Sequence, residues 1–326
     1  MLQPNELKAG LRMDVANGVT STTTKVWEIL FASYKGDLPA IKELVSKSPE
    51  LIYAQYNYTP PIHFAVREGY PAIVQYLLEN GAHNPRYRNY PFLDTLQVIA
   101  EDRDYKEIVI MLEEYSRDPA RQKFDGDNGQ IHFERTELQH EFEQAVDKNN
   151  LNKTRQILQQ HPEFARDETY FWGEGILMMP AKENHREMIE LLMSHGAKVP
   201  DILKWTQAYY FEHYDGAAFM LEKGMNPNVM SWHHVTILHD MAQKGDIQKA
   251  ELLLKHRASL NAVEEEYQST PLGIAARWGQ VEMVKYLIKQ GADPNRSGAI
   301  WSTPLAWAKK KEHIEIGKIL KKAGAV

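Results

Sequence analysis

Glu174, His233 and His234 carry side chains suited to acid–base chemistry, and each lies close to a tryptophan in the sequence. A carboxyl group desolvated beside aromatic rings has a raised pKa and could act as a general acid. A nearby histidine could then act as the general base. These residues form a candidate acid–base set, provided that the fold brings the two distant segments together.

The rest of the sequence excludes several kinds of chemistry. The chain has 326 residues and no Cys, so it has no thiolate nucleophile, no disulfide and no Cys-ligated metal. It contains no nucleophile elbow and no phosphate-binding glycine loop, and Gly173-Glu174-Gly175 is only a fragment of such a loop. His233, His234 and His239 do not have the spacing of a zinc motif. We therefore expect no metal and no cofactor, and a binding protein rather than an enzyme.

Charge and hydropathy indicate the class of partner. The net charge is -6 at pH 7, which argues against a protein that binds nucleic acid by neutralising phosphates. The sequence has no run of 18 apolar residues, and its first residues do not resemble a secretory signal peptide. We expect a soluble cytoplasmic protein that binds neither nucleic acid nor membrane.

The elements that must position these residues are repeats. Four segments align in one frame: 59–85, 236–261, 270–295 and 303–325, and the last three start 34 and 33 residues apart. Each begins with Thr, which can cap a helix, and two continue with Pro-Leu. A short helix, a glycine turn and a second helix with an apolar stripe follow. Two such helices cannot bury both of their faces, so the unit requires neighbours.

These residues resemble the ankyrin repeat family, whose marks are a period near 33 and a T-P-L-H-x-A signature. TPPIHFA, TPLGIAA and TPLAWAK match that signature closely. The resemblance implies an all-α solenoid of helix-turn-helix repeats with short hairpin tips. It also implies that His63 and His239, at the histidine position of the signature, bridge neighbouring repeats by hydrogen bonds.

Weaker units extend the array to about nine repeats, over roughly residues 25–326. We expect an N-terminal extension or cap over 1–24 and a first block of repeats over 25–117. A hairpin-like insertion over 118–136 and a second block over 137–326 would follow, the insertion having an Asp/Asn/Gly turn between apolar residues. The last unit carries six lysines, which we interpret as a solvated terminal cap: Lys309, Lys310, Lys311, Lys318, Lys321 and Lys322.

Aromatic residues are concentrated in the central repeats, where 164–235 hold 11 of the chain's 33. The resemblance implies that ligands meet the hairpin tips and the inner helices. Tips face solvent, so large aromatic residues there indicate either a ligand or packing between adjacent tips. The candidate ligand-binding residues are Tyr170, Trp172, Glu174, Trp205, Tyr209, Trp232, His233, His234, Tyr267 and Trp278.

We interpret the chain as a non-enzymatic recognition module that binds a protein or peptide through its concave face and aromatic tips. Glu174 and Glu264–Glu266 would favour a basic partner. The alternative is a small-molecule-binding or catalytic pocket in the central repeats, with Glu174 and His233 or His234 as acid and base. A third hypothesis is a scaffold that self-associates through its exposed aromatic residues.

Overall fold

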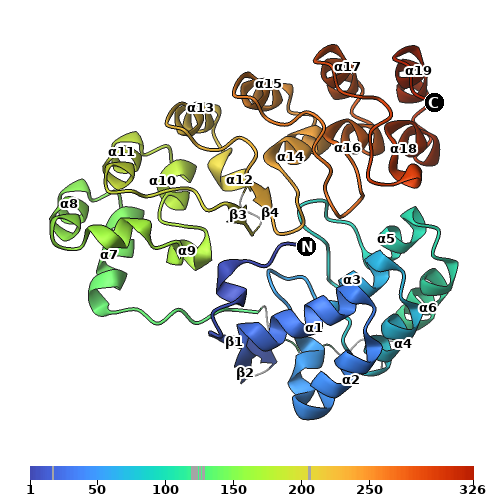
Figure 1. Cartoon of the computed structure of the whole chain (residues 1–326), viewed down its shortest axis with the longest axis horizontal. Coiled ribbons are helices and arrows are strands. Elements are labelled where there is room, and N and C mark those ends of the chain that lie inside the picture. Colours follow the sequence, from blue (N-terminus) through green and yellow to red (C-terminus); the bar gives the residue numbers. More distant parts are fainter. Residues whose placement is uncertain (17, 119–123, 125, 127–128, 205–206) are drawn as a thin grey trace. The chain divides into compact units, whose positions relative to one another are not determined.

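The computed structural model describes residues 1–16, 18–118, 124, 126, 129–204 and 207–326 (Figure 1). The chain forms two compact units. The N-terminal unit contains residues 3–134, and the C-terminal unit contains residues 135–326 together with Met1 and Leu2. Each unit has its own stack of helices, and each is described separately below.

The N-terminal unit starts with a short 3-10 helix and an antiparallel hairpin, followed by three helix pairs. Thr22 and Thr95 cap α1 and α5 by accepting a backbone N–H three residues on. Gly36 and Gly69 end α1 and α3 in the left-handed conformation. The bounds are η1 Asn5–Leu7, β1 Arg12–Ala16, β2 Val19–Thr22, α1 Thr23–Lys35, α2 Leu38–Lys47, η2 Pro49–Tyr53, α3 Pro61–Glu68, α4 Pro71–Glu79, α5 Leu96–Asp102 and α6 Lys106–Ser116.

Strand β1 also pairs with the segment that ends this unit. Met13 bridges Ile131 and Ala16 bridges Gly126, both antiparallel. The N–H of His132 donates to the Arg12 carbonyl at 2.9 Å. The residues expected to form the turn of the insertion include 125, 127 and 128, which lie outside the described residues.

The C-terminal unit is built from the same kind of helix pair, with six pairs and two short strands. Strands β3 and β4 lie in successive tips and pair in parallel, Ile202 with Met230 and Leu203 with Ser231. The bounds are α7 Glu137–Asp147, α8 Leu151–Gln160, η4 Pro162–Arg166, α9 Tyr170–Gly173, α10 Met178–Lys182, α11 Arg186–Ser194, β3 Ile202–Leu203, α12 Gln207–Tyr210, α13 Tyr214–Glu222, β4 Met230–Ser231, α14 Ile237–Lys244, α15 Ile247–Lys255, α16 Pro271–Arg277, α17 Val281–Lys289, η5 Ile300–Ser302, α18 Pro304–Lys310 and α19 Ile314–Lys322.

The predicted all-α repeat architecture is confirmed, with nine helix pairs in the described part of the chain. Thr270 and Thr303 cap α16 and α18 as expected. The expectation for Thr59 was wrong, because Pro60 occupies the cap position of α3 and the Thr59 hydroxyl instead donates to the Asn57 carbonyl. Across the described residues, we find no helix that combines the length and the apolar character needed to cross a bilayer.

Candidate functional site

Two adjacent tips of the C-terminal unit carry the His and Glu residues noted in the sequence. We call residues 229–236 the His tip and residues 262–269 the Glu tip. The N–H of Glu265 donates to the His233 carbonyl at 3.0 Å, so the two tips are joined through their backbones. Within the His tip, the N–H groups of His233 and Val235 both donate to the Ser231 hydroxyl at 3.3 Å. This geometry fixes the directions of the side chains on both tips.

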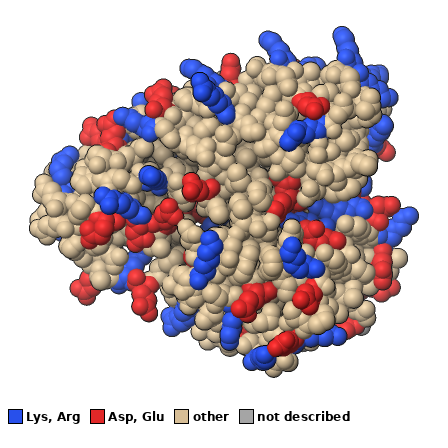
Figure 2. Space-filling view, viewed as in Figure 1, with Lys and Arg blue, Asp and Glu red and all other residues tan. Residues whose placement is uncertain are grey.

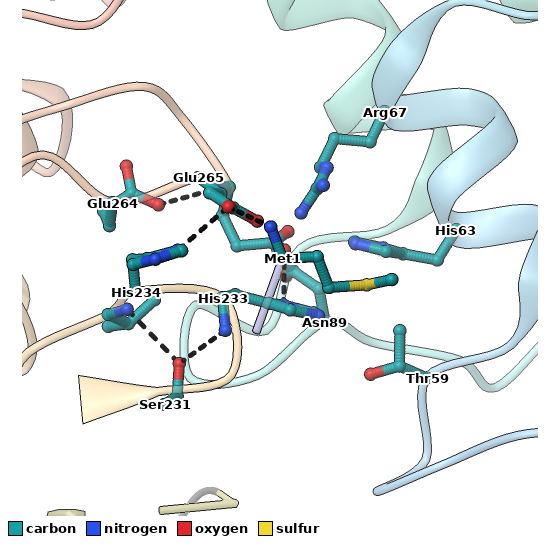
Figure 3. A network of polar contacts seen from close by, with 12 residues as sticks. Met1, Thr59, His63, Arg67, Asn89, Ser231, His233, His234, Glu264 and Glu265 are labelled. Atoms are coloured by element: carbon teal, nitrogen blue, oxygen red, sulfur yellow. Dashed lines mark hydrogen bonds and ion pairs between the residues drawn. The ribbon is translucent and has the colours of Figure 1, made fainter. Parts of the chain in front are cut away.

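Each histidine of the His tip pairs with a glutamate of the Glu tip (Figure 3). His233 Nδ1 donates to Glu266 Oε1 at 2.6 Å, and both side chains are buried. His234 Nδ1 lies 2.9 Å from Glu265 Oε1 at a partly exposed position. Glu265 also pairs with the amino group of Met1, and the Leu2 N–H donates to the Trp232 carbonyl at 3.0 Å. The two histidines therefore connect neighbouring tips through close contacts with glutamate side chains.

Glu264 is a structural residue of its own tip. Its buried carboxylate accepts the backbone N–H groups of Glu266, Tyr267 and Ser269 at 2.6 to 3.0 Å. Burial and, to a smaller extent, the charge of Glu266 raise the pKa of Glu264 to about 8, although the three N–H donors act in the opposite direction. Glu264 and Glu266 are 0% and 1% exposed, and a basic partner remains a prediction.

The aromatic residues of these tips are buried, contrary to the expectation that tip aromatics face solvent. Trp232 is 2% exposed and Tyr267 is 0% exposed. Tyr267 forms a cage with Trp278 and Trp307 around Arg277, whose guanidinium lies 4.0 Å from the centroids of Tyr267 and Trp278 and 5.2 Å from that of Trp307. The reason is cation–π packing, since a buried arginine needs electron-rich surroundings. In the described structure, Tyr267 and Trp278 are occupied in holding Arg277.

Trp172 is 67% exposed, unlike the other site tryptophans that the structure describes, Trp232 and Trp278. Phe171 and Trp172 both have left-handed backbones, with φ of 47° and 62°, and Gly173 follows with φ of 85°. Bulky side chains rarely adopt this conformation, which costs about 1–3 kcal/mol per residue. Such strain persists only where the surroundings hold it in place.

The contacts that hold the Trp172 turn come from α7, its flanking residues and the next tip. The Phe171 N–H donates to Glu143 Oε1 at 2.7 Å, and Arg135 lies 3.3 Å from the other oxygen of Glu143. The same Arg135 donates to the Thr169 hydroxyl at 3.1 Å and stacks 4.2 Å from the ring centroid of Tyr170. The Lys204 ammonium donates to the Trp172 carbonyl. The turn is therefore held on both sides while the indole points to solvent.

The remaining predicted residues occupy varied environments. Tyr170 is buried beside Phe142, with a ring-centroid distance of 5.4 Å. Glu174 is buried at the end of α9, where its carbonyl accepts the Tyr210 hydroxyl at 2.9 Å. Tyr209 is partly exposed, with the Lys182 ammonium 5.8 Å from its ring centroid. Trp205 lies outside the described residues.

The signature histidines make the bridging contacts that the repeat pattern implied. Nδ1 of His239 accepts the Thr236 N–H at 3.1 Å, while Nε2 donates to the carbonyls of Ala262 and Ser269 in the next repeat. Burial lowers the pKa of His239 to about 4. In the N-terminal unit, His63 contacts the Tyr87 hydroxyl at 2.9 Å. Both histidines therefore stabilise the stack.

Asp240, on α14 next to His239, is buried and pairs with Lys244 at 2.7 Å, and burial raises the pKa of Asp240. Within either unit taken alone, no three described His, Asp or Glu side chains lie close enough to share a metal ion. The small-molecule or catalytic pocket remains a prediction.

Sequence reasoning missed the residues that support the Trp172 turn. Arg135 and Glu143 precede it by about one repeat and have no motif of their own. Lys204 lies in the next tip. The sequence gives one weak indication of the aromatic cage around Arg277, because this arginine ends the inner helix immediately before Trp278.

Family models match both units. The model for ankyrin repeats in three copies matches residues 207–298 and 238–326, and the model for ankyrin repeats in many copies matches residues 29–78. Together with the helix pairs and the bridging histidine, these matches decide the family. This chain is an ankyrin repeat protein. Ankyrin repeats generally mediate protein–protein interactions.

Curated relatives match this ankyrin repeat protein over short stretches. The 2-5A-dependent ribonuclease of Mus musculus is 40% identical over 62 residues, which is 19% of this chain and 8% of that protein. The ARF GTPase-activating protein GIT2 of Mus musculus is 31% identical over 83 residues, or 26% and 12% of the two chains. The protein fem-1 homolog A-like of Mus musculus is 31% identical over 106 residues, or 32% and 15%. The matched part is less than a fifth of each relative's length.

Proposed function

We propose that the C-terminal unit recognises a protein partner through a surface centred on Trp172. The observation that carries this proposal is an indole that is 67% exposed on a backbone turn of two strained residues. Exposed tryptophans on rigid supports are the residues that most often dominate binding energy at interfaces. Strain at a turn is also typical of functional sites.

The expected partner offers an apolar pocket that accepts the indole. Because Lys204, Arg135 and Glu143 hold the turn before any partner arrives, little conformational entropy is lost on binding. The buried Tyr170 and Phe171 support the turn from inside. Tyr209, whose ring is partly exposed, would add contact area if the partner extends towards α12.

The test is capture of partners from a native cell extract, followed by affinity measurement with the purified partner. Trp172→Ala should weaken binding by about 2 kcal/mol or more, which is roughly 30-fold in Kd. Ile300→Ala is the matched control, because Ile300 is 93% exposed at another tip of the same unit. Equal affinity of the intact protein and Trp172→Ala would remove Trp172 from the interface.

A second variant distinguishes the contribution of the Trp172 indole from that of the contacts that hold its turn. Glu143→Gln keeps the size of the side chain but weakens its hydrogen bond to the Phe171 N–H and its pairing with Arg135. It should reduce affinity less than Trp172→Ala while leaving helical content unchanged. A loss of helical content in either variant would be detected by far-ultraviolet circular dichroism before binding is interpreted.

A further inference from the structure

Helices α6 and α19 carry net charges of opposite sign. Helix α6, the last of the N-terminal unit's stack, has three glutamates and one lysine. Helix α19, the last of the C-terminal unit's stack, has three lysines and one glutamate. Figure 2 shows Lys and Arg side chains gathered over the region of α17 and α19. Both helices are the outer members of their repeats.

Each helix also exposes an isoleucine on its charged side. On α6, Ile110 is 54% exposed and shares a stripe with Glu107 and Glu114, which are exposed too. The equivalent position in the repeats holds Gln75 in α4 and Lys285 in α17, so a polar residue is the usual choice there. On α19, Ile314 is 73% exposed and shares a stripe with Lys318 and Lys322.

The lysines of α19 differ from those of the preceding helices. Lys223 pairs with Glu190, Lys249 pairs with Asp246, and Lys285 pairs with Glu282. By contrast, Lys318, Lys321 and Lys322 make no ion pair with any described residue. A solvated cap accounts for exposed lysines, and single exposed isoleucines are common on protein surfaces. The opposite charges of α6 and α19 are what favour a contact between two copies of the chain.

We propose that α19 of one copy of this chain binds α6 of a second copy. Placed side by side in parallel, the two helices set Glu113 and Glu114 of α6 against Lys321 and Lys322 of α19. Near the N-terminal ends, this register sets Lys106 of α6 level with Ile314 of α19, and Glu107 level with Glu315. The exposed isoleucines contribute apolar area to the same contact. Since every copy carries both helices, the contact is heterologous, and it joins copies into a ring or an open chain.

The experiment measures the molar mass of the full chain by sedimentation equilibrium. In low salt, about 50 mM, the mass should rise with protein concentration, and about 500 mM salt should reverse the rise because it screens exposed charges. A mass that stays monomeric up to about 100 μM would overturn the proposal, since the contact would be too weak to matter.

Charge reversal assigns the surfaces. Lys321→Glu/Lys322→Glu and Glu113→Lys/Glu114→Lys should each raise the dissociation constant at least ten-fold. An equimolar mixture of the two variants should associate again, because the reversed faces then complement each other. Lys47→Glu/Lys255→Glu is the control, since it makes the same change in net charge at exposed positions on α2 and α15. Association that survives the reversals, or a mixture that stays monomeric, would overturn the assignment.

Discussion

The surroundings of a side chain, more than its residue type, decide whether it is exposed for binding or buried in the stack. Trp232, Tyr267 and Trp172 are all tip aromatics, yet only Trp172 is mainly exposed. Histidines divide in the same way. His233 and His234 connect two tips through glutamates, whereas His239 is buried and bonds to backbone carbonyls. A buried histidine such as His239 should therefore make the stability of the protein depend on pH.

The pKa of His239 gives a signed prediction. Its folded-state pKa is about 4, below the ordinary value of 6.5, so between these values the unfolded chain binds more protons than the folded chain. The stability that depends on neutral His239 is therefore present above pH 6.5 and is lost as pH falls towards 4. His83, whose pKa burial also lowers to about 4, contributes in the same direction.

His239→Gln should remove up to one proton from this pH dependence, a change in slope of about 1.4 kcal/mol per pH unit. It should also cost about 1–3 kcal/mol at pH 7, because hydrogen bonds to buried carbonyls are lost. Urea unfolding between pH 4.5 and 7.5 measures both effects. His213→Gln, at an exposed position, is the control. An unchanged slope in His239→Gln would contradict the assignment.

At the scale of the element, glycines at the ends of inner helices determine how closely repeats approach. A Cβ at Gly69 would lie 2.7 Å from the Tyr105 ring of the next repeat, and one at Gly279 would lie 2.9 Å from His313. Both glycines have positive φ, 79° at Gly69 and 74° at Gly279. The same turn therefore combines a backbone that favours glycine with a close contact between repeats.

Gly69→Ala should destabilise the protein more than Gly10→Ala. Both positions have positive φ, 79° and 68°, so both alanines are strained by about 1 kcal/mol. At Gly10 nothing lies within 4 Å of the added Cβ, whereas at Gly69 the Tyr105 ring must move. We expect an additional loss of about 1–3 kcal/mol for Gly69→Ala, measured by urea unfolding. Equal losses for the two variants would show that the repeats adjust without cost.

Features set by local sequence could be predicted, whereas features set by contacts between distant residues could not. Helix pairs were predictable because Thr caps, Gly turns and apolar stripes act locally and recur in one frame. The burial of Trp232 and Tyr267 could not be predicted from the sequence, because it depends on contacts with neighbouring tips. Nothing in Tyr170-Phe171-Trp172-Gly173 indicates two left-handed residues, since the contacts that hold them come from Glu143, Arg135 and Lys204.

At the scale of the whole molecule, the two compact units each contain a hydrophobic core. Stability in repeat proteins is approximately a sum of each repeat's own contribution and its contacts with neighbours. A substitution in one unit should therefore act mainly on the unfolding of that unit. The chain offers a natural probe of this independence, because Trp27 is alone in the N-terminal unit while the other six tryptophans lie in the C-terminal unit.

Tryptophan fluorescence and circular dichroism should consequently give different midpoints of urea unfolding for variants in different units. Tryptophan fluorescence reports mainly on the C-terminal unit, whereas circular dichroism reports on the helices of both units. Gly69→Ala should lower the midpoint of part of the dichroism transition and leave most of the fluorescence transition unchanged. His239→Gln should shift the fluorescence transition. If both variants shift both probes together, the units unfold as one cooperative body, and the repeats on either side of the 134–135 boundary share their stability.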